Sequence, residues 1–99
     1  MTDPVRLTNH EAARRYEAWV GDDLAGFLTS RLAPGRIVLV HTETLPDWQG
    51  HGVAARLAAG ALDDARARGL SVTPRCPYVA DFIRHHPGEY DDLVDGSAG

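Results

Sequence analysis

The stretch formed by residues 36–69 constrains the fold of this chain more than any other. It begins with an apolar run at residues 36–43, continues through a glycine-containing segment at residues 49–54, and ends in an alanine-rich stretch typical of a helix. Glycines at the start of a helix leave backbone N–H groups uncovered at the positive end of the helix dipole, where anions bind. The stretch therefore predicts a strand, a glycine turn that can hold an anion, and a helix.

The composition indicates one globular domain with an ordinary core. The chain has 99 residues, of which 43% are hydrophobic, and a core of this size needs no metal or disulfide to hold it. We therefore expect one compact domain over residues 1–99, with flexible ends at residues 1–4 and 95–99. The one cysteine, Cys76, cannot form an internal disulfide, which suits a reducing compartment.

Charge and hydropathy argue against several classes of partner. The net charge of −4 argues against a general nucleic-acid binder, whereas the same weak negative field would tolerate a cationic substrate such as an amine. No apolar run approaches the roughly 20 residues that span a bilayer, and the N-terminus lacks a basic region followed by an apolar one. We expect a cytoplasmic protein that binds neither nucleic acid nor a membrane.

Alternation of apolar and polar residues predicts an antiparallel meander ahead of the glycine turn. Residues 5–7 form a short opening strand, residues 8–11 a polar connection, and residues 13–20 a half-buried strand with Tyr16, Ala18 and Val20 on one face. A turn at residues 21–23 leads into a strand at residues 24–32, which has Leu24, Gly26, Leu28 and Leu32 on one face and Ala25, Phe27, Thr29 and Arg31 on the other. A type II turn at Pro34 and Gly35 then leads to the third strand.

The second half of the chain predicts a crossover between parallel strands. Residues 37–40 are all apolar, so the third strand should be covered on both faces and lie at the centre of the sheet. A helix follows at residues 53–68, then a parallel strand at residues 70–73 and a second helix from Pro77 to His86. Tyr90 and Leu93 either fold back onto the core or belong to a mobile tail. The predicted class is α+β with a mixed sheet, in which an antiparallel meander is followed by a βαβ-type crossover and a second helix.

The segment Gln-x-x-Gly-x-Ala at residues 49–54 is a weak motif alone and gains weight from its place between a buried strand and a strong helix. In that setting the sequence resembles the GNAT superfamily of acetyl-coenzyme A dependent N-acetyltransferases, whose pyrophosphate loop reads Gln/Arg-x-x-Gly-x-Gly/Ala. With the segments at residues 40–43, 61–66 and 74–79, the chain is similar to a short, single-domain GNAT-like family over residues 13–94. It departs from a standard GNAT enzyme in having little counterpart of the N-terminal helices that shape an acceptor pocket.

The resemblance implies that acetyl-coenzyme A is the co-substrate and indicates which residues hold it. The pyrophosphate would be lined, mainly by backbone N–H groups, by Gln49, Gly50, His51, Gly52, Val53 and Ala54. The pantetheine arm would pair with the end of the third strand, at Val40, His41 and Thr42, as an added strand does. Tyr78 and Phe82 are expected as walls for this arm. The structural alternative is that the two glycines only shape a tight surface turn.

Cys76 and His41 are the candidate catalytic residues. Cys76 lies next to Arg75 and just before a helix, which favours a thiolate, so it could act as a general acid toward coenzyme A or as a nucleophile that carries the acetyl group. The alternative is a small buried hydrophobic residue. His41 could be the base that takes the amine proton, because imidazole exchanges protons near neutral pH, or a satisfied, partly buried histidine.

These residues predict an acetyl-coenzyme A dependent N-acetyltransferase that transfers an acetyl group to an unidentified amine. The alternative is a non-catalytic acetyl-coenzyme A binding or interaction module, which the short N-terminal region favours. No metal site is expected, because His85 and His86 diverge on their helix and the one cysteine is far from them. We expect a monomer, or a weak homodimer formed through an open sheet edge.

Overall fold

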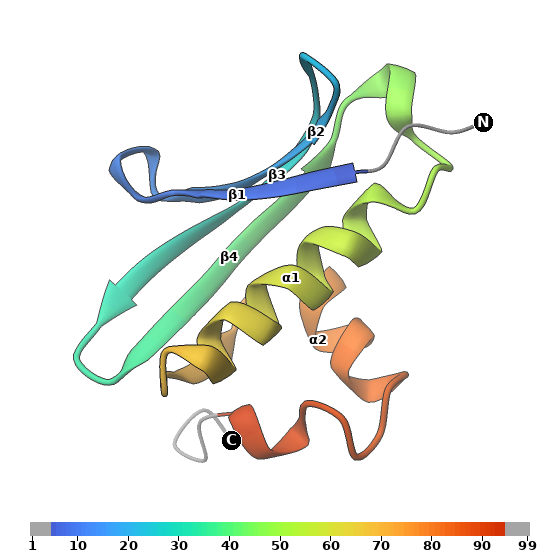
Figure 1. The fold of residues 1–99 in the computed structure, drawn as a ribbon. Coiled ribbons are helices and arrows are strands. Elements are labelled where there is room, and N and C mark those ends of the chain that lie inside the picture. The colour runs from blue at the N-terminus through green and yellow to red at the C-terminus, as the bar shows by residue number, and fades with distance from the viewer. Residues whose placement is uncertain (1–4, 95–99) are drawn as a thin grey trace.

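The computed structural model describes residues 5–94 and shows one five-stranded sheet with helices packed against it (Figure 1). The flexible ends predicted at residues 1–4 and 95–99 lie outside the described residues. In chain order the elements are β1 (Val5–His10), η1 (Glu11–Ala13), β2 (Arg15–Val20), β3 (Asp23–Ala33), β4 (Arg36–Thr44), η2 (Pro46–Trp48), α1 (Val53–Ala67), β5 (Ser71–Pro74), α2 (Pro77–Arg84) and η3 (Asp91–Leu93), where η denotes a single 3-10 turn.

The strands lie in the order β1-β2-β3-β4-β5, with antiparallel pairing up to β4 and parallel pairing between β4 and β5. The predicted α+β class and the crossover through α1 are therefore confirmed. The prediction that β4 is the centre of the sheet is wrong, because β3 occupies that place and β4 lies second from an edge. The prediction that both faces of β4 are buried is also wrong toward the C-terminal end of the strand, where Val40 is 40% exposed.

The first strand is longer than its sequence suggests. The predicted polar connection at residues 8–11 is wrong, since residues 8–10 continue β1 and His10 lies opposite Arg15 of β2. As an edge strand, β1 tolerates polar side chains, so apolar alternation gives no signal there.

The predicted faces of β3 are wrong at one position. Ala25, expected on the face opposite that of Gly26 and Leu28, is fully buried. Ala25 has no register partner in β2, so it is the extra residue of an irregularity around which the alternation of faces breaks. Leu32 lies opposite the buried Ile37, on the face predicted for it, and is 57% exposed because it lies next to the β3–β4 turn, at the end of the sheet.

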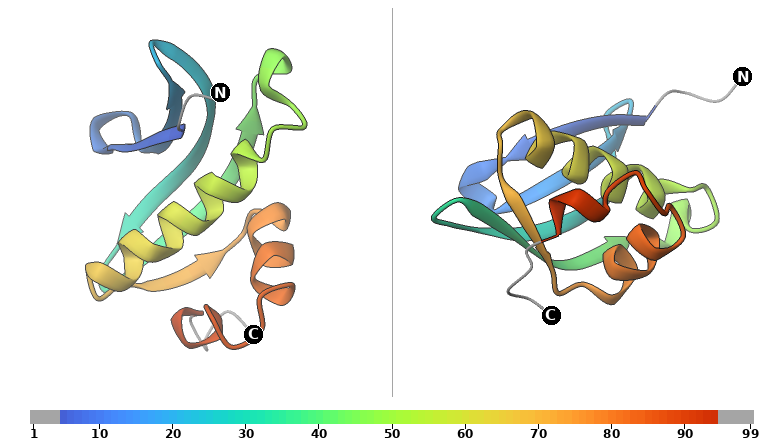
Figure 2. Two further views of the ribbon diagram at one scale, coloured as in Figure 1. Left: turned by 45° about the vertical axis from the view of Figure 1, so that its right-hand side comes forward. Right: turned by 90° about the horizontal axis from the view of Figure 1, so that it is seen from below.

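Helix α1 covers one face of the sheet and contacts all five strands (Figures 1 and 2). The helical spacing of apolar residues predicts one buried face of α1, and its five residues are buried: Val53, Leu57, Ala61, Leu62 and Ala65. Ala58, which was not part of this prediction, is buried as well. Gly26 of β3 allows this close approach, because a Cβ there would lie 2.6 Å from the Glu43 carbonyl oxygen and 3.0 Å from Val53. The small residue at this position therefore fixes the separation between α1 and the sheet.

The C-terminal segment closes the core beside α1. Val79 and Ile83 of α2 and Leu93 of η3 are buried in the same cluster as the apolar face of α1. Arg66 of α1 holds the segment from outside, donating to both Asp92 carboxylate oxygens at 2.8 and 3.1 Å. Of the two alternatives that the sequence left open for Tyr90 and Leu93, the structure shows the one in which they fold back onto the core, with Leu93 buried in the cluster and Tyr90 partly buried against it. No helix in the described range is long and apolar enough to cross a membrane.

Candidate functional site

The glycine turn that precedes α1 has the backbone shape its sequence predicts. Gly50 and Gly52 have φ angles of 83° and 76°, in the left-handed region that other residues adopt at a cost. A Cβ added at either glycine would meet no atom within 4 Å, so the space beside both is open. His51, between them, is exposed and meets the ring of Trp48 edge-on at 5.8 Å. No side chain of residues 5–94 therefore lies over the two glycines of the turn.

Backbone donors at the start of α1 are free to bind an anion. The first bond of helical type runs from Arg56 N to Gly52 O, at 3.2 Å, so the N–H groups of Val53, Ala54 and Ala55 have no intrahelical acceptor. The Val53 side chain is 2% exposed and anchors the turn in the core, leaving its backbone as the functional part. Gln49 donates its side-chain amide to Thr44 O at 3.4 Å and thereby ties the turn to the end of β4.

Strand β4 continues well beyond its parallel neighbour. The β4–β5 ladder ends where Leu39 pairs with Pro74, and the last bond between the two segments runs from Cys76 N to Leu39 O, at 2.8 Å. The register with β3 then shifts by one residue. Thr29 of β3 lies opposite His41, whereas Ser30 lies opposite Leu39, so Val40 has no partner in β3. Residues 40–44 therefore offer a strand edge without a β5 partner, the element to which an extended amide chain can pair.

Cys76 lies where the two parallel strands separate. Its side chain is 2% exposed, it caps the N-terminal end of α2, and its Sγ is 3.3 Å from Thr42 Oγ1. Either of these two atoms could be the donor. The fold thus brings together Cys76 and Thr42, residues 34 positions apart in the chain.

His41 lies on the other face of β4 from Thr42, because neighbouring residues of a strand alternate in direction. Its Nε2 is 3.4 Å from Glu43 Oε1, and the side chains of the two residues are 60% and 52% exposed. The two candidate catalytic residues therefore reach β4 from opposite faces and are not in direct contact. The sequence analysis assigned no role to Glu43. The signal that could have identified it is its position two residues after His41, because strand residues two apart lie on the same face.

The two aromatic residues predicted to line the pantetheine arm differ in position. Tyr78 lies on the first turn of α2 and is 40% exposed. Partial burial, with the nearby Cys76 as a second cause, raises the pKa of the Tyr78 phenol above its ordinary value. Phe82 stacks on His86 with ring centroids 4.1 Å apart and also contacts Tyr90, at 5.8 Å. The ring contacts of Phe82 thus belong to an aromatic cluster at the C-terminal end of α2.

A mixed sheet, whose two parallel strands are joined by a helix that begins at a glycine turn, is the arrangement expected for a GNAT-type fold. Residues 15–93 match the sequence model of the GCN5-related N-acetyl-transferase family, and the chain therefore belongs to this family. The predicted resemblance is thus confirmed.

A solved structure gives independent support for the fold. The chain is similar to the ribosomal-protein-alanine N-acetyltransferase from Brucella melitensis biovar Abortus 2308, with a TM-score of 0.57 and 20% sequence identity. The match covers 78% of this chain and 63% of that chain, so the present chain spans less than two thirds of the length of that protein. At this identity the similarity shows a shared fold.

Proposed function

We propose that this protein is an acetyl-coenzyme A dependent N-acetyltransferase that acts on an amine. The observation that carries this proposal is the pair of left-handed glycines directly before α1, next to a β4 edge without a β5 partner. Membership of the GCN5-related N-acetyl-transferase family supports the same activity. Each part of the site corresponds to one part of the coenzyme.

The residues present fit acetyl-coenzyme A. The free N–H groups at the start of α1 suit the pyrophosphate, and the open space beside Gly50 and Gly52 leaves room for it. Arg56, exposed on the first turn of α1, forms no ion pair within residues 5–94 and is available to a coenzyme phosphate. The pantetheine amides would pair with residues 40–42, which directs the thioester toward the place where β4 and β5 separate.

Acetyl transfer requires a defined exchange of bonds and protons. The amine nitrogen attacks the thioester carbonyl carbon, a C–N bond forms, and the C–S bond breaks with the electron pair going to the coenzyme sulfur. The amine loses a proton, which His41 is suited to take with Glu43 beside it, and the coenzyme thiolate gains one. A backbone N–H at the free edge of β4 would stabilise the carbonyl oxyanion.

Cys76 lies at the end of this path and has two roles open to it. As an acid, its thiol would donate a proton to the coenzyme thiolate and recover one through Thr42. As a nucleophile, its sulfur would first take the acetyl group from the coenzyme and then pass it to the amine. Acetyl-cysteine trapped on the protein in the absence of an amine would identify the second route.

Calorimetric titration with acetyl-coenzyme A is the decisive first experiment. We expect saturable binding, followed by release of free coenzyme A thiol when an amine acceptor is supplied. The chain contains no lysine, so acetyl-lysine formed in the reaction must come from the acceptor. Absence of any binding would sink the proposal.

A coenzyme-binding module without transfer is the second candidate. The observation that favours it is the connection between β1 and β2, which is a single three-residue turn, Glu11–Ala13, rather than a pair of helices that shape an acceptor pocket. Saturable binding of acetyl-coenzyme A with neither transfer to a broad amine panel nor hydrolysis would select this candidate over the enzyme.

A further inference from the structure

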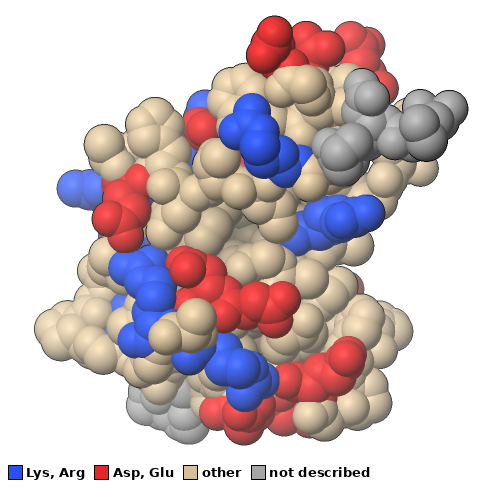
Figure 3. All heavy atoms as spheres, in the orientation of Figure 1, with Lys and Arg blue, Asp and Glu red and all other residues tan. Residues whose placement is uncertain are grey.

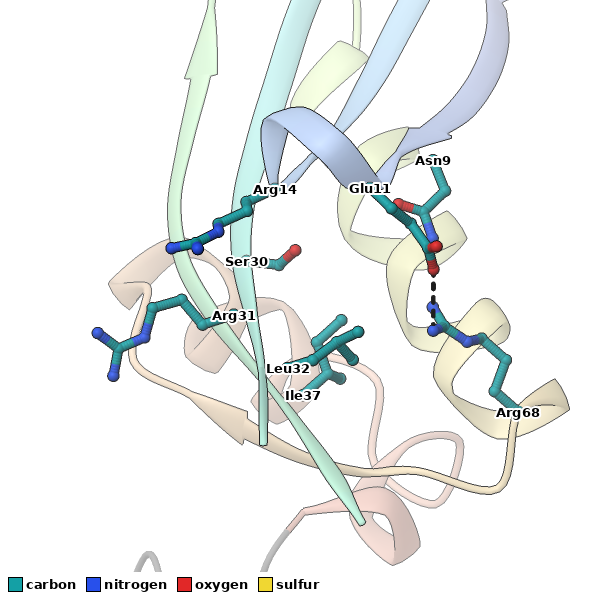
Figure 4. A pocket seen from close by; sticks show the side chains of 8 residues that line it. All are labelled: Asn9, Glu11, Arg14, Ser30, Arg31, Leu32, Ile37 and Arg68. Atoms are coloured by element: carbon teal, nitrogen blue, oxygen red, sulfur yellow. Dashed lines mark hydrogen bonds and ion pairs between the residues drawn. The ribbon is translucent and has the colours of Figure 1, made fainter. Parts of the chain in front are cut away.

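A cavity of about 510 Å³ opens at the end of the molecule where α1 stops (Figure 4). It lies between η1, the adjoining ends of β3 and β4, and Arg68, which caps the C-terminal end of α1. A helix of 15 residues is roughly 22 Å long, and the glycine turn lies at its other end. The coenzyme phosphates therefore do not account for this cavity.

Two arginines of the cavity have no acidic partner among the described residues. Arg68 is neutralised by Glu11 at 3.0 Å and by Asp64 at 3.1 Å. Arg14 and Arg31 form no ion pair within the described part of the chain, and Figure 4 shows their side chains extending to the same side of β3, away from the Glu11–Arg68 pair. Guanidinium groups bind carboxylates through paired N–H donors, so this pair is suited to an anionic ligand.

The backbone of Arg14 is in a strained conformation. Its φ of 56° is the one positive φ of a non-glycine residue in the range 5–94. Glycine would adopt this conformation without strain. A hydrogen bond from Ser30 N to Arg14 O, at 2.9 Å, holds the strained residue against β3. An arginine kept at a site that favours glycine points to a use for its charge.

Ser30 is 8% exposed and is the neighbour of Arg31 in β3, so its side chain points to the opposite face of the strand, as Figure 4 shows. The polar groups on the side of Arg31 are therefore the two guanidinium groups. The C-terminal end of α1 carries the negative end of the helix dipole, so the attraction for an anion must come from the guanidinium groups.

The register of the sheet relates this cavity to the candidate base. Thr29 lies opposite His41, and Arg31 points to the same face of β3 as Thr29 because the two are two residues apart. The Cα of Arg31 is therefore about 7 Å along the strand from the position that faces His41. An amine held at His41 would have its anionic group at this distance or somewhat beyond it.

We propose that Arg14 and Arg31 form the site that selects an amine acceptor bearing a carboxylate. This inference rests on the proposed acetyl transfer and deepens it by naming the class of acceptor. In an extended peptide, a separation of about 7 Å corresponds to an acidic side chain two residues after the reacting amine.

The test measures peptide binding to the full chain by calorimetry, without coenzyme. The probes are the tetrapeptide amides Ala-Ala-Glu-Ala and Ala-Ala-Gln-Ala, and we expect the acidic peptide to bind roughly ten-fold more tightly. Arg31→Gln should remove most of this preference. Arg84→Gln makes the same change in net charge at an exposed position of α2, where Arg84 pairs with Asp81, and should retain the preference.

The pair ω-aminohexanoate and hexylamine repeats the comparison for small acceptors. A preference confined to either pair identifies a small amino acid or a peptide as the source of the carboxylate, and both outcomes support the site. Equal affinities within both pairs would overturn it, as would an equal loss of preference in Arg84→Gln. Because no coenzyme is present, failure of acetyl transfer would sink the proposed function without affecting this measurement.

Arg14→Gly separates a binding role from a structural one. Glycine relieves the positive φ, so we expect an unchanged or raised Tm together with a loss of carboxylate preference. Retention of the preference with a lowered Tm would contradict the proposal and make Arg14 a structural residue of the η1 turn.

Discussion

At the scale of single residues, Gly52 tests whether the turn before α1 binds a coenzyme. An alanine there is strained because φ is 76°, and we expect a loss of about 1 kcal/mol in the free energy of unfolding. Its methyl group would also enter the open space in which we place the pyrophosphate. We therefore expect a much weaker affinity for acetyl-coenzyme A, measured by calorimetry.

Gly21 provides a matched control in the turn between β2 and β3. Its φ is 59° and a Cβ there would meet no atom within 4 Å, so Gly21→Ala imposes the same backbone strain at a distant turn. We expect a similar loss of stability with unchanged coenzyme affinity. Equal affinities in the two variants would mean that the glycines before α1 only shape a surface turn.

Cys76 tests whether the residues beyond Pro74 take part in the chemistry. We expect Cys76→Ala to lower kcat by about 100-fold or more, the usual contribution of a general acid or base, with unchanged affinity for acetyl-coenzyme A. Thr42→Val keeps the shape of its side chain but removes the hydroxyl 3.3 Å from the Cys76 sulfur, so a smaller loss of kcat is expected. Steady-state kinetics with both variants at normal rates would return Cys76 to the role of a buried core residue.

At the scale of elements, the contact among β3, β4 and α1 depends on Gly26. A Cβ at this position would approach the Glu43 carbonyl oxygen to 2.6 Å, and a backbone atom cannot move aside cheaply. We expect Gly26→Ala to lower the free energy of unfolding by about 1–3 kcal/mol, as overpacking does, in urea denaturation. Displacement of Val53 should also weaken coenzyme binding, because Val53 begins α1.

Gly60 is the matched control for this prediction. A Cβ there would lie 2.3 Å from Leu7 Cδ1, which is the end of a flexible side chain on the edge strand. Leu7 can rotate away, and alanine favours the helix by about 1 kcal/mol over glycine, so Gly60→Ala should cost less than Gly26→Ala. A larger cost for Gly60→Ala would contradict this account of how α1 is seated.

Elements defined by local periodicity are the ones that sequence predicts well. The spacing of Val53, Leu57 and Ala61 predicts the buried face of α1 because the helical period involves only neighbouring turns. The apolar run of β4 predicts burial, but not its place in the sheet, since strand order depends on pairing with distant segments. The extra residue Ala25 in β3 gives no signal, because a bulge changes the register without changing composition.

The candidate site divides in the same way. Gly50 and Gly52 are predictable because a turn and a helix start are local. The approach of Cys76 to Thr42 depends on where β5 ends along β4, which is not a local property of the sequence. His41 points away from both because it is the strand neighbour of Thr42. The cavity at Arg14 and Arg31 joins residues of η1 and β3, and alternation assigns Arg31 a face without indicating what lies beside it.

At the scale of the whole molecule, we propose different tasks for the two ends of α1. The N-terminal end has free N–H groups, which we assign to an anionic coenzyme, whereas the C-terminal end borders the arginine cavity proposed for the acceptor. Basic and acidic side chains are interspersed over the face shown in Figure 3, so this face carries no broad patch of one sign. Tyr16 links sheet and helix between these ends, donating its hydroxyl to Asp64 at 2.7 Å.

The acid stability of the molecule should depend on Glu17, a 5% exposed carboxylate on the face of β2 turned away from α1. Burial opposes its charge, but hydrogen bonds with Arg15 at 2.7 Å and His10 at 3.3 Å outweigh this and hold the pKa of Glu17 below its usual value. A lowered pKa in the folded state adds stability at pH values above the unfolded pKa of about 4.3, and this is lost as pH falls through the folded pKa. We expect Glu17→Gln to be less stable than the unmodified chain by about 1–3 kcal/mol at pH 7, and the difference to shrink below about pH 4.

Urea denaturation at a series of pH values checks this dependence, with Glu89→Gln as the control. Glu89 is exposed and its side chain makes no ion pair with any described residue, so its removal should change stability little at any pH. A Glu17→Gln deficit that persists unchanged at low pH would mean that the side chain contributes through packing. The charge that Arg15 and His10 hold in place would then not be what stabilises the outer face of the sheet.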